Sequence, residues 1–154
     1  MKKTVLFLVN HDVTVYAFRL ELVKRLISEG YRVVISTPFG EHVKELAAMG
    51  CECIQIEIDR HGMNPVKDLM LLLAYRKLIK KVKPDMVFTY TIKPNVYGGL
   101  VCRWTKTPYV VNVTGLGTAV ENGGLKQRLV LLLYKLGGKK AQRFFFQNID
   151  NYDF

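Results

Sequence analysis

The sequence has no uncharged apolar run of about 18 residues, which is the length that a membrane-spanning helix requires. Its first residues, Met-Lys-Lys-Thr and a short apolar run, are similar at first sight to a secretion signal. That run is too short for one, and it leads into Asn10, His11 and Asp12 rather than into a small-residue cleavage site. We therefore expect a first buried strand here, and neither a signal peptide nor a membrane span.

Cysteine is also scarce. The three cysteines, Cys51, Cys53 and Cys102, form no CxxC pair and have no ladder of histidines near them. An odd number of thiols without such spacing is typical of buried free cysteines in a reducing cytoplasm. Structural zinc is not expected, because its ligands normally come in closely spaced Cys and His pairs. The sequence accordingly predicts no metal site.

The motifs of the common nucleotide-binding loops are missing. A dinucleotide-binding domain carries GxGxxG after its first strand, whereas residues 10–14 contain no glycine. No GxxxxGK[ST] of a P-loop and no GxSxG of a hydrolase elbow occurs. His11 and Asp12 are adjacent, yet no serine or cysteine nucleophile is placed to use them. NAD, P-loop and hydrolase chemistry are therefore not expected, and no cofactor is predicted.

Acidic residues are rare in the second half of the chain. The formal net charge is +10, and residues 60–143 hold 16 Lys or Arg against three acids, while residues 1–59 hold seven against eight. An uneven basic surface of this kind indicates an anionic partner, which can be a nucleic acid, an acidic membrane surface or a phosphate-bearing substrate. A merely solvated surface is the alternative.

Apolar runs typical of strands alternate with helical patterns along the whole chain. We expect strands at residues 4–10, 32–37, 53–58, 86–90, 109–113 and 143–147. Helices are expected at residues 16–29, 41–49, 65–82, 95–105 and 125–136, and residues 149–154 look like the opening of one more. Because strands and helices alternate at crossover spacing, the predicted fold is α/β, a three-layer, doubly wound parallel sheet.

Polar residues follow several of these strands, and the carboxyl ends of parallel strands share one edge of a sheet, where ligands bind. The loops expected there carry His11 and Asp12, Arg60 and His61, Lys93, and the turn Thr114-Gly115-Leu116-Gly117. The bare backbone N–H groups of that turn, with Asn112 beside it, suit a phosphate or a hydroxyl-rich ligand. Alternatively, Lys93 is an ordinary surface lysine, and the glycines simply form a tight turn.

Glu121 is the only acid between Asp85 and Asp150. A single carboxylate in a basic region near a glycine turn can be an orienting group or a general base. It can equally be an ion-pair partner. The sequence leaves both roles open.

The expected helix at 125–136 is apolar on all sides over residues 129–134, and Lys and Arg residues flank it. One interpretation is a helix buried against the sheet. The other is a peripheral membrane contact, in which apolar side chains enter the bilayer surface and lysines meet lipid phosphates. A second group of Lys and Arg residues lies at the C-terminal end of the helix expected at 65–82.

Several segments, taken in order, resemble a known family. They are LFLVNHDVTVYAFRLELVKRLISEGYRVVISTP, the Asp59-Arg60 loop with Asn64-Pro65, TYTIKPNVYGG, NVTGLGTAVENGG and the closing FFFQN. Together they resemble the N-terminal domain of bacterial family-4 glycosyltransferases, above all those that build capsular polysaccharide, O-antigen or lipid-linked oligosaccharide. The resemblance covers essentially the whole chain.

The resemblance implies one half of a GT-B enzyme, in which two Rossmann-like domains face each other across a cleft. Residues 1–149 would be the N-terminal, acceptor-binding domain, and residues 150–154 the start of the segment that leads to an absent C-terminal nucleotide-sugar domain. Transfer in the family is retaining and independent of metal. The acceptor is often a polyprenyl-diphosphate-linked sugar at the cytoplasmic membrane face.

The implied partners are therefore a lipid-linked or saccharide acceptor, a nucleotide-sugar donor and an anionic membrane surface. The nucleotide sugar is expected to bind mainly the absent domain, so the 154-residue chain alone is expected to be inactive. Its implied location is the cytoplasm, peripheral to the inner face of the cell membrane.

Carried over loop by loop, the resemblance puts His11 and Asp12 in the cleft near the donor sugar or the diphosphate. Arg19 and Lys93 would suit an acceptor phosphate or sugar. Many family members have a histidine in the loop after the fifth strand, which this sequence lacks, and Glu121 is the substitute candidate. The predicted catalytic residues are thus His11, Asp12 and Glu121. The predicted substrate-binding residues are Asn10, Arg19, Arg60, Lys93, Asn95, Asn112, Thr114, Gly115 and Gly117.

Two other functions stay open at this point. The chain can be a non-catalytic subunit that recruits a separately encoded donor domain to the membrane. It can also be a nucleic-acid-binding module that uses its basic face. Aromatic residues interleaved with lysine are sparse there, so stacking platforms are not evident and no nucleic acid is expected as a partner.

Overall fold

The computed structural model describes residues 2–60, 62, 64–115 and 124–147. Within these residues the chain forms a six-stranded sheet whose paired strands are all parallel. The strands are β1 (Thr4–Leu8), β2 (Arg32–Thr37), β3 (Glu52–Gln55), β4 (Met86–Tyr90), β5 (Tyr109–Val113) and β6 (Arg143–Phe146). Their order across the sheet is β3-β2-β1-β4-β5-β6. The predicted doubly wound parallel sheet is confirmed.

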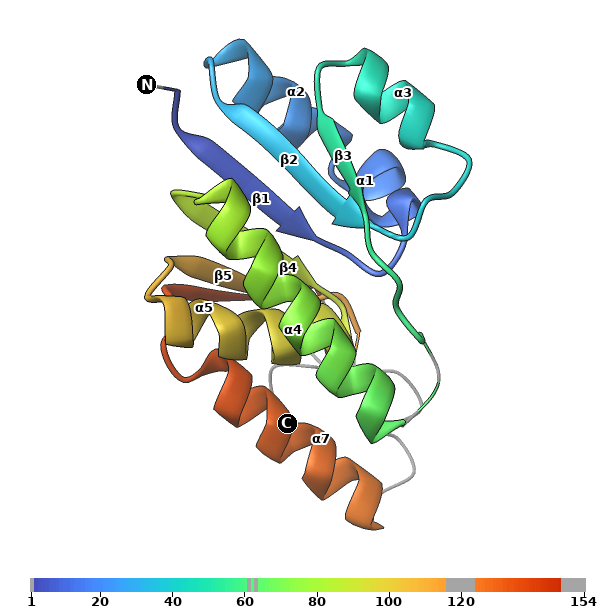
Figure 1. The fold of residues 1–154 in the computed structure, drawn as a ribbon, viewed down its shortest axis with the longest axis vertical. Helices are drawn as coiled ribbons and strands as arrows, with labels where there is room; N and C mark the ends of the chain where they lie inside the picture. The colour runs from blue at the N-terminus through green and yellow to red at the C-terminus, as the bar shows by residue number, and fades with distance from the viewer. Residues whose placement is uncertain (1, 61, 63, 116–123, 148–154) are drawn as a thin grey trace.

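Helices cover both faces of the sheet, so the molecule has three layers (Figure 1). One face carries α1 (Asp12–Phe18), α2 (Leu20–Ser28) and α3 (Val43–Ala48). The other face carries α4 (Pro65–Val82), the π-helical segment η1 (Pro94–Gly98), α5 (Gly99–Thr105) and α7 (Gly124–Gly138). None of the described helices is both long and apolar enough to cross a bilayer.

Strand β1 shows how the sequence supplies both cores. Its five residues are all buried, as expected of a central parallel strand with helices on both sides. Leu6 and Leu8 point into the core under α4, α5 and α7, whereas Val5 and Phe7 point into the core under α1 to α3. Phe7 stacks on Phe88 of β4 with ring centroids 5.3 Å apart. Full burial of one such side chain stabilises the fold by about 1.5–3 kcal/mol.

The prediction of one helix over residues 16–29 is wrong. Helix α1 begins at Asp12, because the Asp12 carboxylate accepts the N–H of Val13 in the first turn, and Nδ1 of His11 lies 3.2 Å from the same nitrogen. The helical path then breaks at Arg19, whose φ of −132° and ψ of 10° are not helical, and α2 begins at Leu20. Most of the loop predicted at residues 10–14 is therefore the first turn of a helix.

Other boundaries also differ. The first strand ends at Leu8 rather than at residue 10, and the third covers Glu52–Gln55 rather than 53–58. The last helix continues to Gly138 instead of ending at residue 136, and the α3 helix is shorter than residues 41–49. The helix from Pro65 to Val82 agrees with its prediction, with Asn64 as the cap. The helical opening expected at residues 149–154 lies outside the described residues.

The helix predicted at 95–105 begins with a π-helical turn. Close packing against α7 accompanies it: a Cβ on Gly99 would collide with the carbonyl of Gly137, and one on Gly137 would lie 2.8 Å from the carbonyl oxygen of Val96. The two backbones approach so closely that only glycine fits at both positions. This contact brings α7 against the loop that follows β4.

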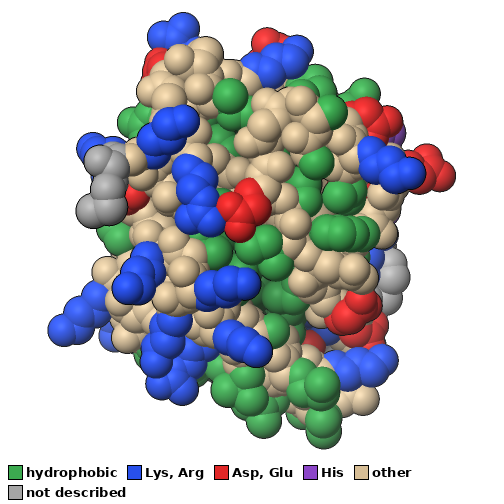
Figure 2. Space-filling model, turned by 45° about the horizontal axis from the view of Figure 1, so that its top comes forward, with side chains coloured by type: hydrophobic (Ala, Val, Ile, Leu, Met, Phe, Trp, Pro, Cys, Tyr) green, Lys and Arg blue, Asp and Glu red, His purple; other side chains and the backbone are tan. Residues whose placement is uncertain are grey.

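The surface view shows Lys and Arg side chains gathered close to one another, with apolar side chains beside them (Figure 2). The exposed apolar residues include Val66, Leu69, Met70 and Leu73 on α4, and Leu125, Leu129, Leu132 and Leu136 on α7. The interpretation of residues 125–136 as a helix buried against the sheet therefore holds for only one side of α7. Its Tyr134 is buried, while its leucines at 125, 129, 132 and 136 face outward.

Candidate functional site

The sheet reverses its direction of winding between β1 and β4. The chain proceeds from β1 to β2 and β3 on one side, and from β4 to β5 and β6 on the other. In open α/β sheets the crevice at such a switch point, outside the carboxyl ends of the strands, is where ligands bind. The structure puts Asn10, Arg60, Lys93 and Gly115 after the carboxyl ends of β1, β3, β4 and β5, so the predicted shared edge is confirmed.

His11 and Asp12 form a dyad at the end of β1. Nδ1 of His11 lies 2.7 Å from Oδ1 of Asp12 and 3.2 Å from the backbone nitrogen of Val13. Nδ1 cannot donate a hydrogen bond to Asp12 and accept one from Val13 at the same time. Because the Val13 N–H also donates to Asp12 Oδ1 at 2.9 Å, we assign the proton to Nδ1 and its hydrogen bond to Asp12. Nε2 of His11 is then the acceptor nitrogen of the half-exposed ring.

Asp12 itself is fully buried. Its Oδ2 accepts the backbone N–H of His42 at 2.8 Å, so the carboxylate links the start of α1 to the loop after β2. Gly40 packs directly on this carboxylate, and a Cβ there would lie 2.6 Å from Oδ2. These contacts make Asp12 a positioning residue that orients His11, and they leave no open path from its carboxylate to a ligand.

Arg19 lies at the break between α1 and α2. Its guanidinium carbon is 5.1 Å from the ring centroid of Tyr90, the last residue of β4, and its Nη1 donates to the carbonyl of Phe18. Burial raises the pKa of Tyr90, and the positive charge of Arg19 opposes part of that shift. The contact holds a half-buried cation beside the switch point, at the boundary between β1 and β4.

Thr91 follows Tyr90 with a φ of 71°, which is unusual for a β-branched residue. Its Oγ1 is buried without a hydrogen-bond partner among the described residues. The same holds for Oγ of Ser36, Nδ1 of His42 and Oδ1 of Asn95, which also belong to this edge of the sheet. Backbone strain and unpaired buried polar atoms both collect at functional sites in proteins. Both are present here.

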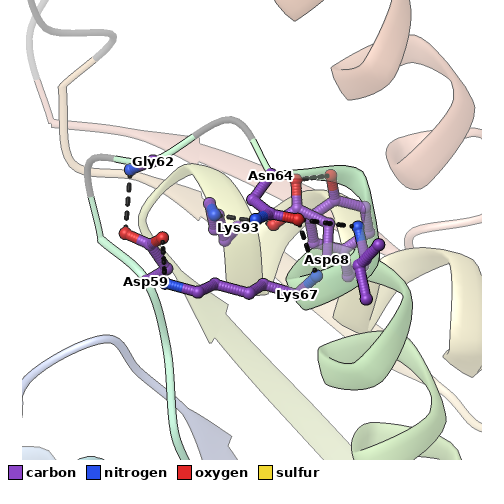
Figure 3. Close-up of polar contacts among 8 residues, drawn as sticks. Asp59, Gly62, Asn64, Lys67, Asp68 and Lys93 are labelled. Carbon is purple, nitrogen blue, oxygen red and sulfur yellow. Dashed lines mark hydrogen bonds and ion pairs between the residues drawn. The ribbon is translucent and has the colours of Figure 1, made fainter.

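Lys93 is bound within the chain (Figure 3). Its Nζ lies 2.6 Å from Oδ1 of Asp68 on α4, and the two side chains are only 14% and 17% exposed. The hydroxyl of Tyr97 donates to the other oxygen of Asp68 at 2.9 Å. Burial, together with the hydrogen bond to Asp68, raises the pKa of Tyr97 to about 12. At the carboxyl edge of the sheet Lys93 is thus part of a triad with Asp68 and Tyr97 rather than a free cation.

A second group of contacts shapes the loop between β3 and α4 (Figure 3). Asp59 accepts the backbone N–H of Gly62 at 2.9 Å and pairs with Lys67 at 3.1 Å. The hydrogen bond from Lys67 holds the pKa of Asp59 below its usual range, and the charge of Lys93 contributes to the same shift. Asn64 caps α4 by accepting from Val66 and Lys67. These bonds fix the loop that carries the exposed Arg60.

Asn95 and Asn112 are buried and hydrogen bonded inside the domain. Nδ2 of Asn95 donates to the carbonyl of Asn112 at 2.9 Å and lies 3.4 Å from the hydroxyl of Tyr134. Nδ2 of Asn112 donates to the carbonyl of Thr89 at 3.2 Å. The two amides thus connect β4, β5, η1 and α7 beneath the carboxyl edge of the sheet. Ligand contact by either of them stays a prediction.

The remaining predicted residues divide into two groups. Asn10, Thr114 and Gly115 are partly exposed at the carboxyl ends of β1 and β5. Glu121 and Gly117 lie outside the described residues, as does His61. Within the described part of the chain no group of three or more His, Cys, Asp or Glu side chains could hold a metal ion.

Comparison with known proteins gives the family. Residues 4–148 match the model of the Glycosyl transferase 4-like family. The chain belongs to this family.

The relatives of this glycosyl transferase 4-like chain include two curated enzymes. Over 153 residues, or 96% of the chain, it is 31% identical to N,N'-diacetylbacillosaminyl-diphospho-undecaprenol alpha-1,3-N-acetylgalactosaminyltransferase from Campylobacter jejuni, of which it covers 41%. Over 74 residues, 48% of the chain, it is 35% identical to UDP-Gal:alpha-D-GlcNAc-diphosphoundecaprenol alpha-1,3-galactosyltransferase from Escherichia coli, of which it covers 18%. The chain therefore spans less than half the length of these relatives.

A solved structure agrees with the family and with the fold. A glycosyltransferase from Rickettsia africae superposes with a TM-score of 0.64 and 25% identity, over 79% of this chain and 33% of that one. The resemblance to family-4 glycosyltransferases of the GT-B type is thereby confirmed, and so is the Rossmann-like fold.

The sequence did not point to three residues of this candidate site: Asp68, Tyr97 and His42. Asp68 carries a signal in retrospect, because it is one of three acids among residues 60–143 and lies four residues after the helix cap Asn64. His42 stacks on Tyr16 with ring centroids 4.1 Å apart, and no pattern in the sequence links residues so far apart.

Proposed function

We propose that this chain is the acceptor-binding half of a retaining glycosyltransferase, which transfers a sugar from a nucleotide sugar to a saccharide linked to a polyprenyl diphosphate. The reaction forms a glycosidic bond at an acceptor hydroxyl and releases the nucleoside diphosphate. The observation that carries the proposal is the switch-point edge of the sheet, where the His11–Asp12 dyad and Arg19 flank the ends of β1 and β4.

The proposed roles follow from the chemistry of these side chains. Arg19 is always charged and offers several N–H donors, which suits the oxygens of a diphosphate. His11, oriented by Asp12 through Nδ1, presents Nε2 to a sugar hydroxyl or, once protonated, to a phosphate oxygen. Asn95 and Asn112 hold the carboxyl ends of β4 and β5 together beneath this edge.

The relatives support the class of acceptor. The names of both curated enzymes specify a sugar on a diphospho-undecaprenol as the molecule to which another sugar is added in an alpha-1,3 linkage. We extend this class of acceptor to the present chain, because the switch-point edge of its sheet joins a cation for the diphosphate with hydrogen-bonding groups for the sugar. The particular sugars are not part of the proposal.

An anionic membrane surface is the proposed second partner. A polyprenyl chain keeps the acceptor in the bilayer, so the enzyme has to work at the membrane surface. The outward leucines of α4 and α7, together with the excess of Lys and Arg in residues 60–143, give the chain apolar and basic groups suited to that surface. We place the protein at the cytoplasmic side of the membrane on the same grounds.

Calorimetric titration of the chain with a short-chain prenyl-diphosphate-linked N-acetylhexosamine tests the proposal. We expect binding, with affinity reduced about ten-fold or more by His11→Ala and by Arg19→Ala, because each removes a hydrogen-bonding group that acts on a charged ligand. Lys44→Gln, a change of charge on α3, is the control. Equal binding of the free sugar, or no effect of either alanine variant, would contradict the proposed site.

A further inference from the structure

An open depression of about 750 Å³ lies at the edge of the sheet opposite the switch point. Its lining residues belong to the ends of α4 and α5 and to the segments that enter β4 and β5. Its lining includes Arg76, Lys80, Lys83 and Lys106, together with Trp104. Because it lies at the amino ends of the strands, it is separate from the proposed acceptor site.

Four cations line the depression and no acid does. Arg76, Lys80 and Lys83 are four and three residues apart, so they share one side of α4, while Lys106 follows α5. None of these four side chains has an ion-pair or hydrogen-bond partner among the described residues. The acid next to the site in sequence, Asp85, is engaged elsewhere, since its Oδ2 accepts the N–H of Thr4 at 2.7 Å.

Two of the cations occupy backbone positions that lysine rarely takes. Lys83 and Lys106 cap α4 and α5 in the left-handed conformation, with φ of 50° and 56°. Glycine usually occupies such positions, as Gly30 and Gly50 do after α2 and α3 in this chain. The need to end each helix does not by itself explain lysine at these positions, because glycine adopts the left-handed conformation without strain.

A cation at a helix C-terminus also favours the helix dipole, and this is the plain structural role for the two lysines. The dipoles of two helix ends together amount to about one negative charge. Four positive charges line the depression, so about three remain uncompensated. The depression therefore has a net positive potential that favours an anion.

Trp104 gives the site an apolar side. It is 57% exposed and lines the depression together with Pro84 and Pro108. A large exposed indole beside uncompensated cations is suited to a ligand with a charged group and a flat or apolar body.

We propose that this depression binds a phosphate-bearing anion, with the phosphate held by Arg76, Lys80, Lys83 and Lys106 and the remainder of the ligand against Trp104. The phosphate can belong to a soluble metabolite or to a lipid headgroup, and the chemistry of recognition is the same. No residue of the proposed acceptor site takes part, so a soluble phosphate ligand would be independent of the proposed transferase function, whereas a lipid phosphate would deepen the proposed membrane contact.

Trp104 is the only tryptophan of the chain, so its fluorescence reports on the depression directly. The chain is titrated with inorganic pyrophosphate and, separately, with vesicles of phosphatidylcholine alone or mixed with phosphatidylglycerol. We expect a saturable change in emission that weakens as NaCl is raised from low concentration to 0.5 M, because salt screens an exposed charge cluster. A change with pyrophosphate identifies a soluble ligand, and a change with the anionic vesicles alone identifies a lipid phosphate.

The variant Lys83→Gly/Lys106→Gly separates binding from helix ending. Glycine suits both left-handed positions, so the fold is expected to persist while two of the four cations are lost. The dissociation constant should rise about 25-fold, roughly five-fold for each cation. Lys24→Gln/Lys44→Gln, which removes two charges from α2 and α3, should leave it within about two-fold. The proposal is overturned if neither probe changes the emission, or if the two double variants bind alike.

Discussion

Lys93 and Asp68 form an ion pair between the loop after β4 and helix α4, with Nζ 2.6 Å from Oδ1 and both side chains mostly buried. Loss of one member of such a pair leaves the other charge without compensation in a region of low polarity. We expect Lys93→Met and Asp68→Asn each to lower the free energy of unfolding by about 2 kcal/mol. Urea denaturation followed by circular dichroism measures the change.

Lys24→Met is the matched control, because Lys24 pairs with Glu21 on the exposed surface of α2. Exposed pairs of this kind contribute about 0–1 kcal/mol. A change at Lys93 no larger than the change at Lys24 would show that the buried pair contributes little to stability. If the Lys93 variant binds the acceptor less tightly, its free energy of unfolding shows whether a less stable fold accounts for the loss.

The hydroxyl of Tyr97 reports on the same triad through its ionisation. Burial and the hydrogen bond to Asp68 raise the pKa of Tyr97 to about 12. Asp68→Asn removes the negative charge, so the pKa of Tyr97 should fall toward that of a free tyrosine while burial keeps it partly raised. NMR of ring-labelled tyrosine as a function of pH measures it, and Tyr97→Phe identifies the signal.

The sign of the effect on stability follows from the direction of this shift. The folded state binds the Tyr97 proton more tightly than the unfolded state does. The stabilisation is therefore complete below the pKa of the unfolded tyrosine, and it is lost as the pH rises through the folded value of about 12. In Asp68→Asn the loss should begin at the same pH, which the unfolded tyrosine sets, but it should be smaller and be complete at a lower pH. An unchanged Tyr97 titration in this variant would contradict the hydrogen bond.

The sheet could be predicted from the sequence, because the apolar runs and turn residues that mark each strand are local patterns. The strands at 32–37, 86–90 and 109–113 are compact apolar runs between turn residues, and the structure has them at the same residues. The long helix at 65–82 has Asn64 as its cap and Pro65 in its first turn, both of which are visible in the sequence. The edge shared by Asn10, Arg60, Lys93 and Gly115 follows from parallel pairing alone.

The details of the site depend on contacts between residues distant in sequence, and the sequence does not reveal them. The break at Arg19 accompanies its contact with Tyr90, 71 positions later. Lys93 was predicted to face a ligand, and the side chain that binds it, Asp68, comes from a helix whose orientation is set by packing. Asn95 and Asn112 were predicted to bind substrate, and the structure shows both buried, with Asn95 beside Tyr134 of α7.

The close contact between Asp12 and Gly40 predicts an energetic coupling between α1 and the loop after β2. Asp12→Ala removes the acceptor for the N–H groups of Val13 and His42 and should cost about 2–3 kcal/mol. Gly40→Ala places a methyl group against a carboxylate that cannot move away, and should cost about 1–3 kcal/mol. In the double variant the methyl group has room, so the total should fall at least about 1 kcal/mol short of the sum.

Chemical denaturation of the two single variants and the double variant gives this coupling. Additive costs would mean that the loop relaxes away from α1 without resistance. Asp12→Ala should also lower the affinity for the diphosphate-linked acceptor, because His11 loses the partner that orients it.

The outward leucines of α4 provide the sharpest test of membrane association. Leu69 and Leu73 are 57% and 51% exposed and lie one helical turn apart on the same side of α4. If that side enters the surface of the bilayer, replacing either leucine by serine removes about 1 kcal/mol of apolar burial, which is about a five-fold loss of affinity for vesicles that contain phosphatidylglycerol. Co-sedimentation with such vesicles measures the partition coefficient.

Leu22→Ser, on the exposed side of α2 in the opposite layer, is the matched control and should leave binding unchanged. Equal losses for the α2 and α4 variants would exclude a membrane contact centred on α4, since a bilayer that covers one layer of helices cannot also bury the other.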